Sequence, residues 1–311
     1  SFISQFGIGF LSSFLVADKI VIKTRKPQGP GLKITITNLR DYFDVRPLDE
    51  DFEPGTEVSL HLKQSKINYC RSLEYAGYLK TNIRFLDIPV RLHDQDGRVT
   101  TIGREAMTYH DDRTADIDFT APLAFKHSEG YLLIRAKKNV DHIFTVETAT
   151  GGVSVFQDGI FITQLDTLLP EGARQHVVGR INLMGEDKCA LSMDRNRIFW
   201  TDAQLMKIKR TIRIGLAEAT HRFLEAADAQ QIAEGTRSSI VNQLAIFFDF
   251  NEVDDSVHQR LNSSIRRIVE KRFRDFIRIH FSHTNRVEGI PEADGYSQRW
   301  QQQIVNAFRK N

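Results

Sequence analysis

Hydrophobic and polar residues alternate along three short runs in the first part of the chain, at residues 19–23, 32–37 and 57–62. A period of two is typical of half-buried antiparallel strands. Residues 26–31, between the first two runs, are rich in Pro and Gly and predict a turn. The pattern therefore predicts one helix followed by a small antiparallel sheet, and a sheet of this size has only a thin core.

The middle of the chain contains both strand patterns, with a period of two, and helical patterns, with apolar residues at steps of three and four. Residues 63–68 are polar, and we expect a domain boundary there; residues 69–85 then predict a helix with one apolar face. Strand signals follow at residues 88–92, 131–135, 153–162 and 176–183. Asp158-Gly159, inside the third run, is the strongest hairpin or bulge signal of the chain. Strands mixed with helices predict an α/β sandwich, and a generic α+β domain is the alternative that periodicity leaves open.

The last part of the chain has a helical period. Thr201 and Gln204 fit a capping box at the start of a helix. Apolar residues at steps of three and four then mark one face: Leu205, Ile208, Ile212, Leu216, Ala219 and Phe223. Gly235 is expected to end this region, and two further helices are predicted near residues 238–248 and over residues 256–281. The last helix is rich in Arg, and we expect its basic face to be solvated.

Composition narrows the classes of function. Hydrophobic residues make up 41% and charged residues 26% of the 311 residues, which is typical of globular proteins. The formal net charge is +2, so no nucleic acid is expected as a partner, and no apolar run approaches the ~20 residues that span a bilayer, so no membrane is expected either. Cys70 and Cys189 are isolated, which predicts reduced thiols in a cytoplasmic protein. None of the 10 His residues has metal-ligand spacing, and we interpret His110-Asp111-Asp112 as a solvated loop.

Two segments carry candidate chemistry. Gly7 and Gly9 precede an apolar, helix-forming run, and backbone N–H groups at such a turn can face a phosphate, although most Gly-x-Gly pairs are ordinary turns. Residues 191–198 contain Asp194-Arg195, which is either a surface ion pair worth about 0–1 kcal/mol or a phosphate-binding arginine. A guanidinium suits the second role because it binds two phosphoryl oxygens at once.

The first of these segments resembles a known family. Residues 1–18 are similar to a segment of the heat-shock protein 90 chaperones that follows the lid of the ATP site, although Ser4 stands where the family usually has Gly. Residues 43–47 and 54–62 resemble the closing strands of that ATPase domain, whose split fold is shared with gyrase B, sensor histidine kinases and MutL (the GHKL superfamily). Residues 177–183 and 191–198 resemble a middle-domain loop that carries an arginine to the ATP.

The resemblance implies a fold and a site. The fold class is α/β (α+β): the C-terminal half of a GHKL ATP-binding sandwich at 1–66, an α/β middle domain at 67–200 and a helical region at 201–311. Arg195 is the implied catalytic residue that senses the γ-phosphate, and Arg197 is its alternative because a shift of the loop register would exchange them. The implied nucleotide-binding residues are Gln5, Phe6, Gly7, Ile8, Gly9 and Phe10 at the phosphates, and Thr56 beside the adenine.

The resemblance also implies a function. It is that of an ATP-dependent chaperone in which hydrolysis is coupled to docking of the middle domain, with ATP/ADP and client proteins as partners, in a cytoplasmic homodimer. The cofactors are ATP and Mg; the Mg ligand and the general base are expected upstream, so these 311 residues alone are not expected to hydrolyse ATP. Two alternatives stay open: a DNA-handling ATPase like MutL or a topoisomerase, in which a lysine commonly meets the phosphate, and a degenerate nucleotide-sensing scaffold.

Overall fold

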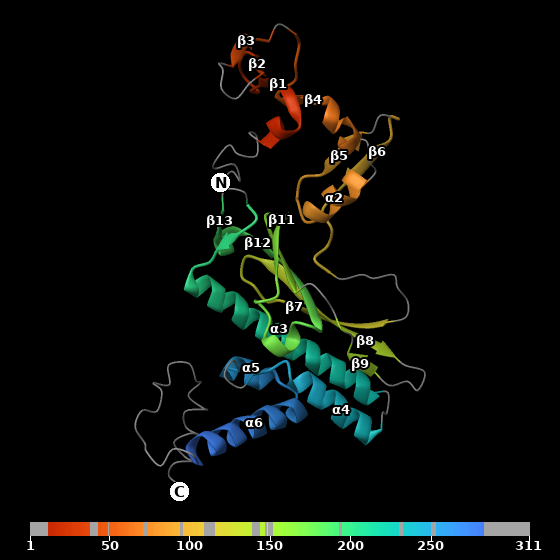
Figure 1. Cartoon of the computed structure of the whole chain (residues 1–311), viewed down its shortest axis with the longest axis vertical. Helices are drawn as coiled ribbons and strands as arrows, with labels where there is room; N and C mark the ends of the chain where they lie inside the picture. The colour runs from red at the N-terminus through yellow and green to blue at the C-terminus, as the bar shows by residue number, and fades with distance from the viewer. Residues whose placement is uncertain are drawn as a thin grey trace. The chain divides into compact units, whose positions relative to one another are not determined.

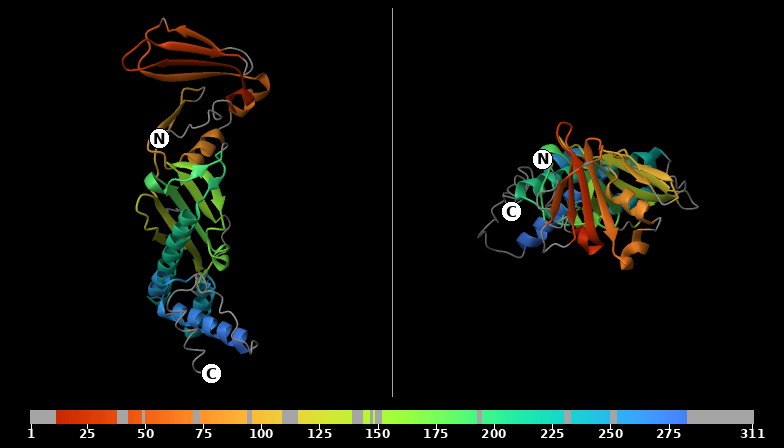
Figure 2. Two further views of the ribbon diagram at one scale, coloured as in Figure 1. Left: turned by 90° about the vertical axis from the view of Figure 1, so that its left-hand side faces the viewer. Right: turned by 90° about the horizontal axis from the view of Figure 1, so that it is seen from above.

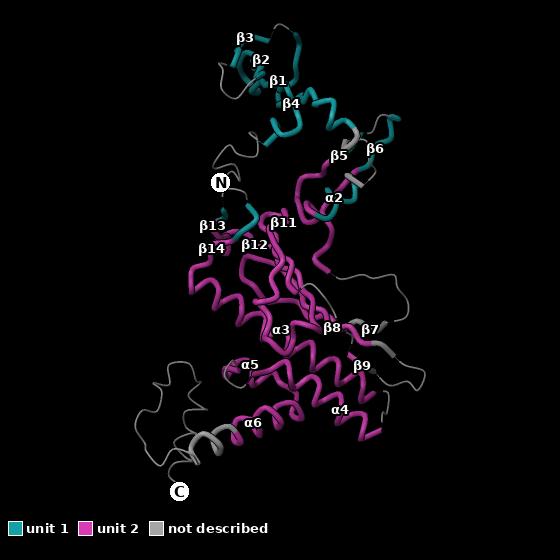
Figure 3. Tube along the Cα trace, viewed as in Figure 1, with its two compact units in different colours: residues 1–81, 92–100, 191–197 teal, residues 82–91, 101–190, 198–311 magenta. Residues whose placement is uncertain are grey.

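The computed structural model divides the chain into two compact units (Figure 3). It describes residues 12–37, 43–48, 50–70, 74–93, 96–108, 116–138, 144–146, 148, 152–192, 195–229, 233–249 and 253–282. Unit 1 comprises residues 1–81, 92–100 and 191–197, and unit 2 comprises residues 82–91, 101–190 and 198–311. The division into three domains at residues 66/67 and 200/201 stays a prediction.

Unit 1 contains a four-stranded antiparallel sheet with the strand order β3-β2-β1-β4 (Figures 1 and 2). Its strands are β1 (Ala17–Arg25), β2 (Leu32–Ile36), β3 (Asp44–Pro47) and β4 (Gly55–Leu62). The three alternating runs are thereby confirmed as strands. Of the predicted first helix, the described part is the 3-10 turn η1 (Ser12–Leu15).

The strand register separates the two faces of this sheet. Ile20 pairs with Ile36 and Leu60, and Ile22 pairs with Ile34 and Val58. Because paired residues point to the same side, one face is apolar and comprises Ile20, Ile22, Ile34, Ile36, Val45, Val58 and Leu60. We call this set the apolar face of unit 1. Ile20 is fully buried, whereas Val58 is 51% exposed.

The helix predicted at residues 69–85 is shorter in the structure. The 3-10 helix η2 (Gln64–Cys70) follows β4, and α2 spans Glu74–Asn82. The helix ends before Phe85. This side chain is 1% exposed, and the Phe85 backbone N–H donates to the Gly159 carbonyl instead of to a carbonyl of the helix. Tertiary packing thus ends the helix earlier than its apolar pattern predicts. Two short strands, β5 (Val90–His93) and β6 (Val99–Ile102), pair with each other.

Unit 2 is built on a larger sheet with the order β11-β10-β12-β8-β7, and β9 pairs with β8. Its strands are β7 (Asp116–Pro122), β8 (Glu129–Lys138), β9 (Phe144–Val146), β10 (Val153–Gln157), β11 (Ile160–Leu165) and β12 (Val177–Leu183). The pair β10–β12 is parallel and the other pairs are antiparallel. The predicted runs at 131–135, 153–162 and 176–183 are confirmed in this sheet, and the run at 88–92 is confirmed as β5. The strands β6, β7 and β9 were not predicted.

Asp158 and Gly159 form the tight turn between β10 and β11, which confirms the predicted hairpin. Both residues have positive φ angles, 50° and 82°, as a two-residue type I′ turn requires. A Cβ on Gly159 would lie 2.3 Å from the carbonyl carbon and oxygen of Phe85. The side chain of Asn182, itself buried, accepts a 2.8 Å hydrogen bond from the Gly159 N–H. Only glycine satisfies both the turn and this close contact.

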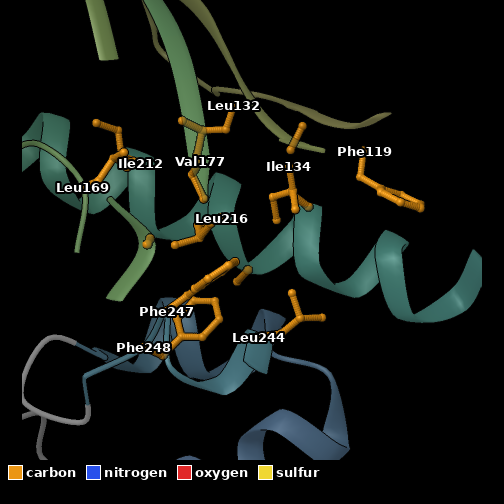
Figure 4. Packing of buried hydrophobic residues seen from close by; sticks show 14 of the residues in the cluster. Phe119, Leu132, Ile134, Leu169, Val177, Ile212, Leu216, Leu244, Phe247 and Phe248 are labelled. Carbon is orange, nitrogen blue, oxygen red and sulfur yellow. The ribbon is translucent and has the colours of Figure 1, made fainter. Parts of the chain in front are cut away.

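The long helix α3 (Asp202–Ala229) lies between the sheet and the remaining helices of unit 2 (Figure 4). Its predicted capping box is confirmed: Thr201 Oγ1 accepts from the Gln204 N–H at 3.2 Å, and Gln204 Oε1 accepts from the Thr201 N–H at 3.1 Å. Leu132, Ile134 and Val177 of the sheet face one side of α3, and Leu244, Phe247 and Phe248 lie on the other. The fold class α/β (α+β) is therefore confirmed.

The single helix predicted over residues 256–281 is wrong. The structure has α5 (Asp255–Arg260) and α6 (Ser263–Ser282), separated by Leu261 in an extended conformation. The break arises because the Asn262 side chain accepts from the Ser264 N–H at 2.9 Å and caps the start of α6. Gly235, expected to end the helical region, lies in the first turn of α4 (Glu234–Ala245).

The basic residues of the last helix are mostly exposed, as expected, but two of its arginines also bind backbone carbonyls. Arg272 donates to the Ala245 carbonyl at 2.9 Å, and Arg266 donates to the Leu261 carbonyl at 3.1 Å. Carbonyls at helix C-termini lack intrahelical partners and attract cations, so these arginines stabilise the C-terminal ends of α4 and α5. Of the helices that the structure describes, none combines the length and the apolar character that crossing a membrane requires.

Candidate functional site

The predicted phosphate-binding residues Gln5, Phe6, Gly7, Ile8, Gly9 and Phe10 lie outside the described residues. Their role therefore stays a prediction. The turn η1 that follows them is fixed to the end of the unit 1 sheet: Lys63 donates from its ammonium to the Phe14 carbonyl at 2.8 Å and from its backbone N–H to the Val16 carbonyl at 2.9 Å.

Thr56 lies at one end of the apolar face of unit 1. It pairs with Thr24 of β1, and the two hydroxyl oxygens are 2.9 Å apart. The Thr24 hydroxyl also donates to the Gly55 carbonyl at 3.3 Å. Both side chains continue the row that contains Ile22 and Val58. A flat apolar group lying on this face would thus meet two hydroxyls at its edge, which suits a purine ring.

Arg195 lies in a tight loop between the short strands β13 (Ala190–Leu191) and β14 (Ile198–Phe199). Ser192 closes the loop: its N–H donates to the Arg197 carbonyl at 3.0 Å, and its hydroxyl accepts from the Arg197 N–H at 3.0 Å. The Arg195 N–H donates to the Ser192 carbonyl at 2.9 Å. The loop therefore has a defined backbone at the residue for which sequence reasoning predicts a catalytic role.

The backbone of Arg195 is strained. Its φ is 56°, and Asp158 is the other non-glycine residue with a positive φ among the residues that the structure describes. An L-residue pays about 1–2 kcal/mol for this conformation because its Cβ approaches the following carbonyl oxygen. Such strain is concentrated at functional sites. The Arg195 side chain is half-buried, whereas Arg197 is exposed.

The segment that leads into this loop belongs to unit 2 and is held there by side chains of the β10–β11 hairpin. The Gln157 amide accepts from the Cys189 N–H at 2.9 Å and donates to the Cys189 carbonyl at 3.3 Å. Lys188 forms an ion pair with Asp158 at 2.7 Å. Burial, together with the nearby Asp187 carboxylate, raises the pKa of the Cys189 thiol to about 11. At neutral pH this cysteine is a thiol, which gives it a packing role rather than a nucleophilic one.

Asp187 anchors the same segment to α3. Its carboxylate accepts from Lys207 at 2.5 Å and from the Ser128 hydroxyl at 2.9 Å. Burial acts to raise the pKa of Asp187, but the hydrogen bonds from Lys207 and Ser128 and the Lys207 charge outweigh it, so this pKa is lowered. The ionised carboxylate is thus the form that unit 2 stabilises.

One cavity in unit 2 was not anticipated. It has a volume of about 510 Å³ and is lined by four cationic side chains, those of Arg174, Lys209, Arg213 and Arg272. A signal was present in the sequence, since Lys209 and Arg213 are four residues apart on one helix and therefore share a face. As for metals, no group of three or more His, Cys, Asp or Glu side chains that could hold an ion occurs in the described part of the chain.

The fold and these residues define an α+β protein with a strained arginine loop and a hydroxyl pair on an apolar sheet face. No protein-family model matches the chain. Part of the chain is similar to bacterial chaperones: it is 30% identical over 95 residues to the chaperone protein HtpG of Rickettsia rickettsii (strain Sheila Smith), which is 30% of this chain and 15% of that protein. It is 31% identical over 104 residues to the HtpG of Francisella tularensis subsp. novicida, 32% of this chain and 16% of the relative.

These matches have a limited extent. The chain spans about 15% of the length of the curated relatives it matches, at an identity of about 30%. Over this stretch it shows weak homology to HtpG chaperones, which belong to the heat-shock protein 90 family. The resemblance inferred from the sequence is therefore supported for part of the chain.

Proposed function

We propose that the protein is an ATP-dependent molecular chaperone of the heat-shock protein 90 type. The observation that carries the proposal is the partial homology to HtpG, whose name describes a chaperone. In this proposal residues 1–66 form the closing half of the ATP-binding domain, residues 67–200 form the middle domain, and residues 201–311 form a helical extension.

The loop geometry supports a phosphate-sensing role for Arg195. A strained backbone is retained only where the surrounding structure determines it, and the hydrogen bonds of Ser192 do so here. The loop 191–197 is part of the same compact unit as residues 1–81, which contain Thr56 and the Gly-rich segment. A guanidinium positioned in this way would bind γ-phosphoryl oxygens in a bidentate manner. Arg197 is the weaker candidate because it is exposed.

The apolar face of unit 1 supports the predicted adenine site at Thr56. Its isoleucine and valine side chains offer an apolar surface to a ring, and Thr24 and Thr56 offer hydroxyls to the polar edge of that ring. ATP, when bound, would supply the free energy of its phosphoanhydride bond. In the proposal the general base and the Mg ligand come from residues outside this chain.

The remaining parts of the proposal concern the whole protein. A chaperone of this type binds client proteins, works as a homodimer and is cytoplasmic. Closing of the ATP site would dock the middle domain and change the exposed surface, so that nucleotide and client binding are linked. The proposed partners are nucleotide and client proteins, and the proposal includes no nucleic acid and no membrane.

The test is a comparison of two arginine variants in the full-length protein. An arginine that acts on the phosphoryl group in the transition state contributes about 10³–10⁵ to the rate of phosphoryl transfer. We therefore expect Arg195→Ala to lower the ATPase kcat at least ~100-fold while the Kd for ATP stays within about threefold. Arg197→Ala is the matched control and should keep its turnover. Steady-state ATPase assays and nucleotide titration of both variants measure these values.

Three outcomes would change the conclusion. Equal loss in both variants, or no loss in Arg195→Ala, would mean that Arg195 has no special role. ATP binding without turnover in the unaltered protein would favour the degenerate, nucleotide-sensing scaffold. DNA binding whose affinity falls steeply with salt would favour a DNA-handling ATPase instead.

A further inference from the structure

The cavity of unit 2 has the size of a small-molecule site. Its volume is about 510 Å³, within the range of roughly 300–1,000 Å³ typical of ligand pockets. Four segments line it: the connection between β11 and β12, helix α3, the residues that follow α4, and helix α6. All of them belong to unit 2, so the cavity is independent of the proposed ATP site.

The walls of this cavity are fixed by close packing. Gly172 in the short 3-10 helix η3 (Glu171–Ala173) touches the residues after α4, because a Cβ at this position would lie 2.0 Å from the Ile246 carbonyl oxygen. The neighbouring Leu169 is 2% exposed and Ala173 is fully buried in the core cluster. The connection between β11 and β12 is therefore held in place on both sides, and the cavity is pre-formed.

The charges around the cavity are unbalanced. Four cations, Arg174, Lys209, Arg213 and Arg272, line it together with two carboxylates, Glu171 and Asp249, so cations exceed carboxylates by two. Lys209 and Arg213 lie four residues apart on α3, where like charges destabilise a helix by about 0.2–0.5 kcal/mol. An arrangement that costs stability in the absence of an anion favours the binding of one.

Arg174 is incompletely hydrogen-bonded by the protein itself. Its Nε–H is buried, and within the described part of the chain no hydrogen-bond acceptor contacts it. A buried donor without a partner is costly, and a charged donor especially so. Arg272 differs, since one of its guanidinium nitrogens donates to the Ala245 carbonyl. Because the Arg174 side chain also lines the cavity, its guanidinium charge is available to an anion bound there.

The apolar lining indicates what the rest of the ligand is like. Leu168 and Phe248 are buried at the cavity with 3% exposure each, whereas Ile246 is 53% exposed. We propose that this cavity binds a small phosphate ester, with its phosphate at Arg174 and Lys209 and its organic part against Ile246. A phosphate dianion matches the excess of two cations, and a guanidinium binds its oxygens in a planar, bidentate way.

The experiment titrates the 311-residue chain with phenyl phosphate and with inorganic phosphate at low salt, by calorimetry. Phenyl phosphate is expected to bind more tightly than inorganic phosphate. Arg174→Gln and Lys209→Gln should each weaken its binding at least about tenfold, because a charged hydrogen bond contributes roughly 1.5–3 kcal/mol. Arg267→Gln is the control: Arg267 is exposed on α6, does not line the cavity, and loses the same charge. Its Kd should stay within about twofold.

Several results would overturn the proposal. One is the absence of binding at millimolar phenyl phosphate, and another is an equal loss of affinity in Arg267→Gln. A third is equal affinity for the two probes, which would mean that the cavity does not recognise the organic group of a phosphate ester. Because the Arg174→Gln variant removes a buried group, thermal unfolding is compared for all variants, and Lys209→Gln alone suffices if Arg174→Gln is unstable. Titration of Arg195→Ala separates the two sites: if only this variant loses the probe, the phosphate belongs to unit 1 and the cavity is not a phosphate site.

Discussion

In unit 2, Leu132, Ile134 and Val177 are fully buried where the sheet faces α3 (Figure 4), whereas in unit 1 Val58 and Leu60 are 51% and 39% exposed on the apolar face. Both sheets have strands with alternating residues and regular antiparallel pairing. The difference is what lies against the apolar side. In unit 2 a 28-residue helix packs on it, with further helices behind that helix.

This difference determines how each sheet is stabilised. Burial of apolar surface contributes about 25 cal/mol per Å², so the layered unit 2 derives its stability from packing. The sheet of unit 1 buries only Ala17, Ile20 and Val21 among its described strand residues. The exposed part of its apolar face, at Val45, Val58 and Leu60, is therefore available for contact with another molecule or polypeptide, and such patches mark binding surfaces. The proposed adenine site at Thr56 lies at one end of this face.

The largest loss of stability is expected for a substitution that tests how closely two backbone segments of unit 2 pack. Gly159→Ala in unit 2 would place a methyl group 2.3 Å from the Phe85 carbonyl in a residue whose φ is 82°. We expect a loss of about 2–5 kcal/mol, since the positive φ costs about 1–2 kcal/mol and overpacking adds about 1–3 kcal/mol. Denaturant unfolding followed by segment-resolved hydrogen exchange measures the loss within unit 2.

Gly97→Ala in unit 1 is the matched control. Gly97 has a similar φ of 77°, but no atom lies within 4 Å of the position that its Cβ would occupy. This variant should pay only for the backbone conformation, about 1–2 kcal/mol. Equal losses in the two variants would mean that the contact with Phe85 contributes nothing, and that unit 2 is no more tightly packed than unit 1 at these turns.

The second prediction compares one chemical change in the two sheets. Val155→Thr replaces a fully buried methyl group of β10 by a hydroxyl, and Val58→Thr makes the same change at a residue that is 51% exposed. A buried hydroxyl without a partner costs about 1–3 kcal/mol, whereas exposed substitutions change stability by less than about 0.5 kcal/mol. Urea unfolding with segment-resolved hydrogen exchange measures both. A cost at Val58 as large as that at Val155 would show that the apolar face of unit 1 is covered in solution.

Local patterns predicted the fold where local interactions determine it. The alternating strands of unit 1 and the Thr201 capping box depend on neighbours in the sequence, and both are present in the structure. The break between α5 and α6 was missed because an apolar step of four continues across it, through Val257, Leu261, Ile265, Val269 and Phe273. Both helices bury their apolar sides in unit 2, so periodicity does not reveal the cap at Asn262.

The candidate sites likewise combine features that local sequence patterns predict with features that only the folded chain determines. Motif similarity predicted a role for Arg195, and this stays a prediction; its positive φ and the closing bonds of Ser192 depend on the folded loop. The cavity of unit 2 joins Arg174, Lys209 and Arg272 from segments far apart in the sequence. A pattern within one helix cannot bring such segments together, so the cavity became visible only in the structure.

The smallest change in stability is expected for the removal of one carboxylate from an ion pair, and we compare one such pair in each unit. Asp187 of unit 2 has a side chain 7% exposed and is bound by Lys207 and Ser128, whereas Glu50 of unit 1 is 54% exposed beside Lys23. Asp187→Asn should cost about 1.5 kcal/mol at pH 7, the lower end of what hydrogen bonds to a charged group contribute, because the Asn amide oxygen can still accept one of them. Glu50→Gln should leave the unfolding free energy nearly unchanged because water screens this pair.

The pH dependence gives the sign of the Asp187 contribution. Its pKa is lowered in the folded state from the ordinary value of 3.8, so its stabilisation is fully present above that value and is lost as the pH falls through the folded pKa. Urea unfolding of the unaltered protein and of Asp187→Asn should therefore differ by a constant amount from pH 7 to about pH 5, and by less below about pH 4. A difference that grows as the pH falls would mean that the charged carboxylate destabilises unit 2, and that its segment is held by packing alone.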